Sequence, residues 1–190
     1  GAGTNPNLRL DNLGGLTMTQ LNARYYETTY RRQMFTVANQ GPTGVTSTAV
    51  LSGTYTGLFL QNPTTSTVNL VLTKAGYAIT VAGTAGVIGL MTGTGASIAA
   101  TLLTTVRNRF VGGVGSQALA AATCTLPGTA VVETIFGSQT SALDAGLGPK
   151  VVDLEGSLIL PPGAFCAFYT STATGTSGFF GSFQWMEVPL

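Results

Sequence analysis

Residues that commonly carry out chemistry are scarce in this chain. It contains no histidine, which removes the commonest general base and the commonest metal ligand. It also lacks a Walker lysine motif, a Gly-x-Ser-x-Gly elbow and a Cys-x-x-Cys pair. We therefore expect no catalytic residue, no metal and no cofactor, and we predict that the protein is not an enzyme.

The carboxylates supply only weak candidates for a reactive site. The acids available for a glycosidase-type pair are Glu133, Asp144, Asp153, Glu155 and Glu187. Asp153 and Glu155 occupy alternate positions of a predicted strand and so share one face. With Asp144 they could offer oxygen ligands to calcium, but no loop has the dense Asp/Asn spacing of such sites. A strand edge that is exposed or faces a partner is the favoured interpretation.

A glycine-rich motif is similar to a nucleotide-binding fingerprint. Gly113-Val-Gly-Ser-Gln-Ala118 follows a predicted strand, and Glu133 comes about 20 residues later. The fingerprint needs a following helix within a βαβ unit, yet the apolar run from Leu119 stops at Pro127. Nucleotide binding is therefore not expected.

The two cysteines, Cys124 and Cys166, both lie in apolar, strand-like runs. Two cysteines in a chain of this size do not form a disulfide framework. We favour buried free thiols, although the sequence alone leaves a bridge between them open.

Arginine is the more informative residue type. The arginines fall in an N-terminal group and a second, smaller group: Arg9, Arg24, Arg31 and Arg32, then Arg107 and Arg109. No run of Lys/Arg occurs, and Asp11 and Glu27 dilute the first group, so a nucleic-acid partner is not favoured. We predict that these six arginines bind another protein subunit.

The composition indicates a folded protein that assembles. Of the 190 residues, 44% are apolar and only 8% are charged, and the net charge is +1. That apolar content is too high for a disordered chain. A surface with so little charge is best explained if other subunits cover much of it.

The chain divides into an arm, residues 1–24, and a β-sandwich domain, residues 25–190. Short runs of β-branched and aromatic residues recur at intervals of about 8 to 12 residues, which is typical of a sandwich or barrel. The predicted strands are 30–37, 45–51, 55–61, 67–73, 77–82, 87–92, 106–111, 129–136, 151–160, 165–171 and 179–188. Residues 97–106 fit either a helix or a strand.

The last predicted strand has large apolar residues on both faces. Phe179, Phe183 and Trp185 alternate with Phe180 and Met186, so both sides of residues 179–188 are apolar. We expect Phe179, Phe183 and Trp185 to form core or self-association contacts. A strand buried on both faces would lie beneath another layer or inside an oligomer.

Residues 75–106 contain no charge and lie between Lys74 and Arg107, an arrangement that mimics a membrane span. Their many glycines, threonines and serines are too polar and too disruptive for a transmembrane helix, so no membrane partner is expected. No signal peptide opens the chain and no Asn-x-Ser/Thr sequon occurs, which favours an intracellular or virion origin.

Two C-terminal segments resemble small jelly-roll structural proteins of tailed bacteriophages. They are Val152-Asp-Leu-Glu-Gly-Ser-Leu-Ile-Leu-Pro-Pro-Gly163 and Gly181-Ser-Phe-Gln-Trp-Met-Glu-Val-Pro189. In such proteins a Leu-Pro-Pro-Gly turn leads into the penultimate strand. The resemblance covers about the last 40 residues, and it implies a jelly-roll-like antiparallel β-sandwich.

The resemblance also implies a role. Such proteins are commonly trimeric decoration, cement or fibre-like components, so we expect a homo-oligomer, with a trimer favoured. It would bind the major capsid protein or another virion protein on the capsid surface after synthesis in the host cytoplasm. The alternative is a receptor- or carbohydrate-binding module of a tail or fibre, with exposed rings drawn from Tyr25, Tyr26, Tyr55, Tyr77, Tyr169 and Trp185.

Overall fold

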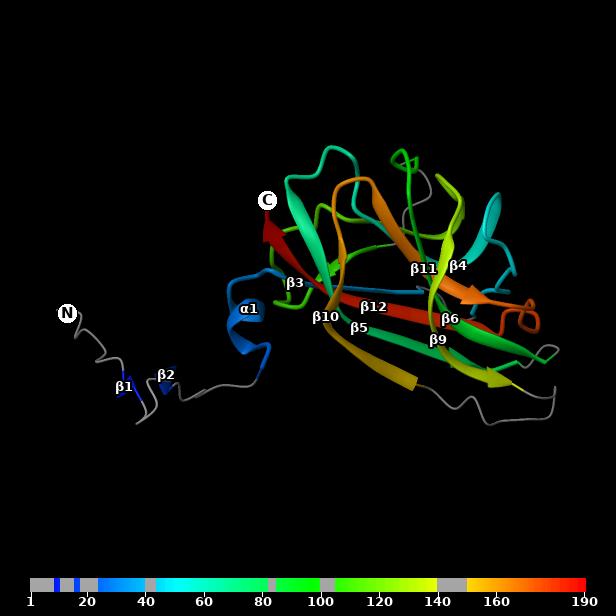
Figure 1. Ribbon diagram of the computed structural model, residues 1–190, viewed down its shortest axis with the longest axis horizontal. Coiled ribbons are helices and arrows are strands. Elements are labelled where there is room, and N and C mark those ends of the chain that lie inside the picture. Colours follow the sequence, from blue (N-terminus) through cyan, green and yellow to red (C-terminus); the bar gives the residue numbers. More distant parts are fainter. Residues whose placement is uncertain are drawn as a thin grey trace.

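The computed structural model describes residues 9–10, 16–17, 24–39, 44–81, 85–99, 105–139 and 150–190. These residues form one short helix, α1 (Tyr26–Tyr30), and a series of antiparallel strands (Figure 1). The strands are β1 (Arg9–Leu10), β2 (Leu16–Thr17), β3 (Met34–Ala38), β4 (Thr54–Gln61), β5 (Val68–Ile79), β6 (Gly86–Thr94), β7 (Arg107–Asn108), β8 (Leu119–Thr125), β9 (Val131–Gln139), β10 (Lys150–Leu160), β11 (Ala164–Thr170) and β12 (Phe179–Pro189). β1 and β2 pair only with each other.

The remaining strands form two five-stranded sheets. One has the order β10-β5-β12-β3-β7 and the other β8-β4-β11-β6-β9. Early strands pair with late ones in reverse order: β3 with β12, β4 with β11, β5 with β10 and β6 with β9. Figure 1 shows the first of these pairs, the blue β3 beside the red β12. This nested pairing defines a jelly roll and confirms the predicted all-β sandwich.

The main core lies between the two sheets. Phe168 on β11 packs against Phe183 and Phe179 on β12, with ring centroids 4.7 and 5.3 Å apart. Trp185 stacks on Phe35 of β3 at 6.2 Å. The side chains of Phe179, Phe183 and Trp185 are fully buried within this single chain. In this chain the three residues therefore form core.

A second, smaller core covers the outer face of the β4–β11 sheet. Phe59 and Phe165 meet there at 5.2 Å, and Met91 and Ile98 are buried beside them. Loop residues cover this smaller core, and two of them are joined where Ala130 N donates to Leu51 O at 2.7 Å. β11 is thus buried on both faces by the chain's own residues.

Within this single chain, the last strand is covered on one face. On β12, one face is buried, whereas Phe180, Ser182, Gln184 and Met186 on the other are only half-buried. β11 does have two buried faces, and it carries an unbroken apolar run from Ala164 to Tyr169. An apolar run of that kind is the usual sign of a strand between two layers.

Two turns beside the sheets are fixed by specific chemistry. Pro162 and Gly163 form the centre of a turn in which Ala164 N donates to Pro161 O at 2.9 Å, and Gly163 has φ +85°, as a type II turn requires. The buried Asn62 side chain donates to Val68 O at 2.7 Å and Leu160 O at 2.9 Å. Asn62 thereby ties the β4–β5 turn to the β10–β11 turn.

Several predicted elements differ from the structure. Tyr30 belongs to α1, residues 45–51 form only an isolated bridge at Val45, and the strand predicted at 106–111 is reduced to β7. The strands predicted at 67–73 and 77–82 are one strand, β5, because Gly76 lies inside the sheet, opposite Ser182. β8 was not predicted. Within 97–106, residues 97–99 are irregular and 100–104 lie outside the described residues.

Both thiols are free and buried, as predicted, Cys124 on β8 and Cys166 on β11. Burial raises the pKa of Cys124 to about 12 and raises the pKa of Cys166 further. Among the described residues, no helix is long and apolar enough to cross a membrane.

Candidate functional site

The structure joins two arginine segments that are far apart in the sequence. β3 pairs with β7, with Thr36 opposite Arg107, and Arg109 N donates to Met34 O at 2.8 Å. The Asn108 amide also donates to Arg32 O at 2.7 Å. Residues 24–32 and 107–115 thus lie side by side, and we call them the arginine–aromatic surface. They contain five of the chain's eight lysines and arginines.

Exposed aromatic rings accompany these arginines. Tyr26 and Tyr30 are 49% and 63% exposed, and their rings lie nearly parallel with centroids 6.0 Å apart. The Arg32 guanidinium lies 5.0 Å from the centre of the Phe110 ring. Together with Arg24, Tyr25 and Thr29, these aromatic residues line a largely apolar groove of about 530 Å³.

Helix α1 is short and is held by local contacts. Glu27 lies in its first turn, where a negative charge suits the helix dipole, and accepts a 2.6 Å bond from Arg31 four residues later. The helix ends at Arg31, and Arg32 then adopts a positive φ of 63°. This geometry turns the chain from the helix into β3.

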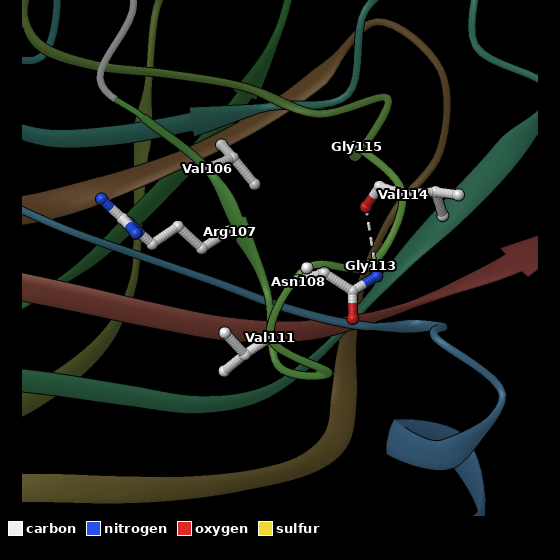
Figure 2. A pocket seen from close by; sticks show the side chains of 8 residues that line it. Val106, Arg107, Asn108, Val111, Gly113, Val114 and Gly115 are labelled. Atoms are coloured by element: carbon white, nitrogen blue, oxygen red, sulfur yellow. Dashed lines mark hydrogen bonds between the residues drawn. The ribbon is translucent and has the colours of Figure 1, made fainter.

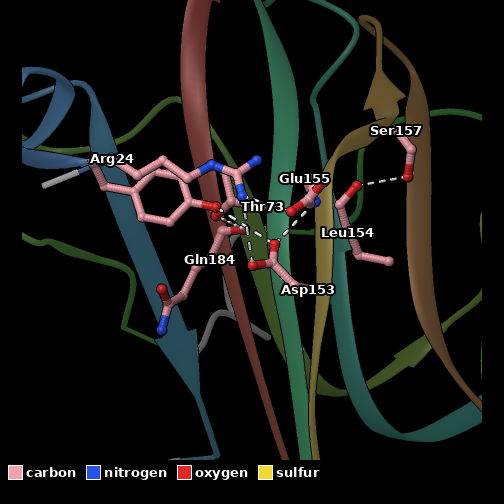
Figure 3. Close-up of polar contacts among 8 residues, drawn as sticks. Arg24, Thr73, Asp153, Leu154, Glu155, Ser157 and Gln184 are labelled. Atoms are coloured by element: carbon pink, nitrogen blue, oxygen red, sulfur yellow. Dashed lines mark hydrogen bonds and ion pairs between the residues drawn. The ribbon is translucent and has the colours of Figure 1, made fainter. Parts of the chain in front are cut away.

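A polar clamp fixes the start of this segment (Figure 3). The Arg24 guanidinium lies 2.6 Å from a Glu155 carboxylate oxygen and 3.8 Å from Asp153. The hydrogen bond to Glu155 is the main reason that the pKa of Arg24 rises above its ordinary value. The Tyr25 hydroxyl donates to Asp153 at 3.5 Å. Arg24, placed from sequence among the partner-binding residues, is thus held within its own chain.

The two carboxylates of the clamp are presented by a bulge in β10. Pairing with β5 is interrupted between Asp153 and Leu158, where Glu155 and Gly156 have φ values of +51° and +82°. The Asp153 carboxylate also accepts from the Glu155 backbone N–H at 3.1 Å. A bulge commonly redirects side chains in this way. Both acids therefore contact Arg24 at the irregular part of β10.

The 107–115 loop is the second segment of the arginine–aromatic surface, and it presents apolar side chains (Figure 2). Its shape depends on Asn108, which accepts from Phe110 N at 2.8 Å and donates to Val114 O at 3.2 Å. Val111 at the tip is 94% exposed, and Gly112 beside it has φ +81°. After Gly113–Ala118 the chain enters strand β8, so the glycine motif lacks the helix that a dinucleotide site needs.

The other candidate acids have separate structural partners. Glu187 accepts from Ser116 Oγ and Gln117 N, and Glu133 accepts from Thr92 Oγ1 at 3.1 Å. Asp144 lies outside the described residues. Within the described part of the chain, no three His, Cys, Asp or Glu residues come close enough to hold a metal ion.

Three guanidiniums of the surface remain available to a partner. Arg24 and Arg31 form ion pairs, whereas Arg32, Arg107 and Arg109 form none with the acids that the structure describes. For Arg9 the structure describes only the backbone, in β1. Arginine and tyrosine are the residues most enriched at the energetic centres of protein interfaces. The surface is therefore suited to binding an acidic partner.

Sequence reasoning identified the arginines but missed Tyr30 and Phe110 as surface residues. Both were placed in predicted strands, at 30–37 and 106–111. The available signal was Asn108 followed by Gly112 and Gly113, which are turn residues. Of the rings considered for carbohydrate binding, Tyr55, Tyr77 and Trp185 are buried and only Tyr26 is well exposed.

Comparison of the chain with models of protein families, with curated proteins and with solved structures finds no match. The class of the protein is therefore set by its own strand order, which is that of a jelly-roll sandwich.

Proposed function

We propose that this protein is a non-enzymatic structural component of a virion, of the head-decoration or cement type. In this proposal it is made in the host cytoplasm, self-associates as a homo-oligomer with a trimer favoured, and sits on the capsid surface. It binds the major capsid protein or another virion protein. It works by buried contact area and needs no chemistry of its own.

The arginine–aromatic surface is the observation that carries this proposal. The chain has only eight cationic side chains, and five of them lie in the two segments that meet at this surface. Three of the five, Arg32, Arg107 and Arg109, form no ion pair with the acids that the structure describes. Because the remaining surface has so little charge, such a concentration marks a direction in which the protein attracts an acidic partner. The exposed Tyr26, Tyr30 and Phe110 rings add apolar contact area beside the charges.

The start of the domain supports the same direction of binding. Arg24, the last residue of the predicted arm, is clamped to Asp153 and Glu155 at the edge of this surface. The arm and the surface would then reach the same partner. This arrangement suits a protein that adds its arm to a contact already made by its folded domain.

Cosedimentation with heads of the parent phage, stripped of this protein, tests the proposal. We expect Arg107→Glu with Arg109→Glu to weaken binding at least tenfold, because an acidic partner would then be repelled. The matched control, Arg107→Lys with Arg109→Lys, keeps the charge and should retain most of the binding. Deletion of residues 1–23 should also weaken binding, relative to the full chain. Unchanged binding by the glutamate variant would contradict the proposal.

A second candidate is a receptor- or carbohydrate-binding module of a tail or fibre. The observation in its favour is the parallel, exposed pair Tyr26 and Tyr30, since flat aromatic faces are suited to stacking against sugar rings. A glycan array tests it directly. A hit that is lost in Tyr26→Ala with Tyr30→Ala would favour this function, and an array without hits would count against it.

A further inference from the structure

Helix α1 ends with an arginine at a position where glycine is the usual residue. Arg32 N donates to Thr29 O at 2.9 Å. Gln33 N donates to Thr28 O at 3.0 Å, and the two bonds together are those of a Schellman C-cap. The residue that follows such a cap, here Arg32, has a positive φ of 63°. Glycine adopts this conformation freely, whereas a side chain is disfavoured in it.

The arginine at position 32 therefore points to a use for its side chain. The chain contains 26 glycines, yet none stands at the position of α1 that favours one most. A residue held in a disfavoured backbone conformation is a sign of function when its side chain is exposed, as that of Arg32 is.

The Arg32 guanidinium is positioned by a ring and has no counter-ion among the described acids. It lies over Phe110, 5.0 Å from the ring centre, and forms no ion pair with the acids that the structure describes. Arginine can stack on an aromatic ring and still offer a planar set of N–H donors that matches a carboxylate. Arg32 can therefore receive a carboxylate from another molecule.

The aromatic groove begins at the same ring. Phe110 lines it from the 107–115 loop, and Tyr26 and Tyr30 line it from α1. The two tyrosines are four residues apart, so they share one face of the helix, and their rings are exposed and nearly parallel. Tyrosine rings provide a large contact area at a low cost in conformational entropy. An apolar side chain can therefore bind here, next to the Arg32 guanidinium.

The charges around the groove favour an acidic segment as its occupant. The acids in contact with this surface are already paired with Arg24 and Arg31. Arg32 and Arg109, on either side of the Phe110 contact, form no ion pair with any described acid. A basic segment would be repelled by these two charges, whereas a segment that carries carboxylates would be attracted and oriented by them.

We infer that Arg32 and the aromatic groove form a binding site for a short acidic segment of the partner protein. A carboxylate of that segment binds the Arg32 guanidinium, and a neighbouring apolar side chain enters the groove between Phe110 and the two tyrosines. This inference deepens the proposed function and rests on it for a protein as the partner. Because the helix cap and Phe110 fix Arg32 before binding, little order has to be gained when the segment binds.

Selection from a random peptide library, displayed on ribosomes with the full chain as bait, tests the inference without assuming a phage partner. We expect the enriched peptides to carry Asp or Glu beside an aromatic or aliphatic residue. Fluorescence anisotropy then measures the Kd of the most enriched peptide. Arg32→Gly should raise this Kd by about tenfold or more, and Tyr30→Ala by about fivefold.

Two matched controls separate the site from general effects of charge and apolar area. Arg31→Gln removes the same charge one position away, and Val111→Ala shortens an exposed apolar side chain outside the groove. Each should change the Kd by less than about threefold.

Thermal unfolding distinguishes a binding role of Arg32 from a structural one. Arg32→Gly places glycine at the positive φ, so its unfolding temperature should equal or exceed that of the wild type while peptide binding falls. A lower unfolding temperature together with an unchanged Kd would show that the arginine serves the fold, and would overturn the inference.

The remaining outcomes separate the inference from the proposed function. Without enriched acidic peptides, or with a Kd that Arg32→Gly and Tyr30→Ala leave unchanged, the inference is wrong, and head binding that depends on Arg107 and Arg109 would still support the proposed function. Peptide binding that depends on Arg32, without any binding to phage heads, would overturn the proposed function alone. A glycan-array hit that requires Tyr26 and Tyr30, with no peptide enriched, would assign the groove to a sugar and overturn the inference.

Discussion

The centre of the sandwich and its outermost strands β9 and β10 are built from similar residues but have different surroundings. β4 and β11 are buried on both faces, by the opposite sheet and by the chain's own loops. β9 and β10 carry valine, isoleucine, leucine and phenylalanine as well, yet only Leu160 of their described side chains is buried. Apolar character in a strand therefore does not reveal which strands make the core, because position within the sheet decides it.

The largest effect should come from truncating a buried ring at the centre of the main core. Phe168→Ala removes a side chain packed against Phe179, Phe183 and Tyr77. We expect the free energy of unfolding to fall by about 3–5 kcal/mol, because a cavity remains between the sheets. Urea denaturation measures this loss. A loss of less than about 1 kcal/mol would mean that the centre can collapse around the gap.

Alkaline pH should lower the free energy of unfolding through the two buried thiols, Cys166 in the main core and Cys124 in the smaller one. Burial raises the pKa of Cys124 to about 12, and that of Cys166 is raised too, while an unfolded thiol titrates near 9.0. A raised folded pKa gives stability that is complete below pH 9 and is lost as the pH rises toward the folded value. Between pH 8 and pH 10 each thiol should cost about 1.4 kcal/mol of unfolding free energy.

Denaturation of Cys166→Ala at both pH values isolates one of these thiols. The variant should show a smaller decrease between pH 8 and pH 10 than the wild type does. An equal decrease in both proteins would show that Cys166 already ionises in the folded chain or that other groups govern the alkaline loss.

A smaller effect is expected at Asn62, where the central layer reaches its turns. Asn62→Ala leaves the carbonyl groups of Val68 and Leu160 without their donor. Buried acceptors without partners destabilise a fold by about 1–3 kcal/mol. We expect the free energy of unfolding to fall by that amount, as measured by thermal denaturation. Asn69→Ala, at a half-buried position of β5, is the control and should change stability less.

The smallest effect should appear on the outermost strand β9. Ile135→Ala removes an exposed side chain, so the dilute monomer should lose at most about 0.5 kcal/mol. Chemical denaturation at a concentration below the association range measures it. A loss comparable to that of Phe168→Ala would remove the distinction between the two regions.

The sequence predicts the strands whose signals are local. Pro162-Gly163 marks the turn before β11, and alternating residues mark β12. Prediction from sequence fails where a residue is required by a contact that is distant in the sequence. Gly76 resembles a break, but it lies inside β5 because Ser182 of β12 occupies the space that a side chain would need. β7 is the outermost strand of its sheet and pairs with β3 over only two residues, where the sequence predicts a strand at 106–111.

The candidate site shows the same division. Its arginines could be chosen from the sequence because they cluster and the rest of the chain is nearly uncharged. That Arg32 and Arg107 belong to one surface depends on the pairing of β3 with β7, which no local pattern encodes. The last strand illustrates the same point. Its alternation predicts two apolar faces, and the tertiary structure decides which of them the chain itself buries.

The nested pairing of early with late strands has a consequence for how the chain folds. Thr36 on β3 donates to Phe183 O on β12, 147 residues further along. Contacts this distant in sequence form slowly, because a long loop must close before they are gained. During synthesis, β3 and β5 would wait for β12, the strand that lies between them. A ribosome that stalls before residue 179 should therefore hold an unfolded chain that chaperones and proteases can recognise.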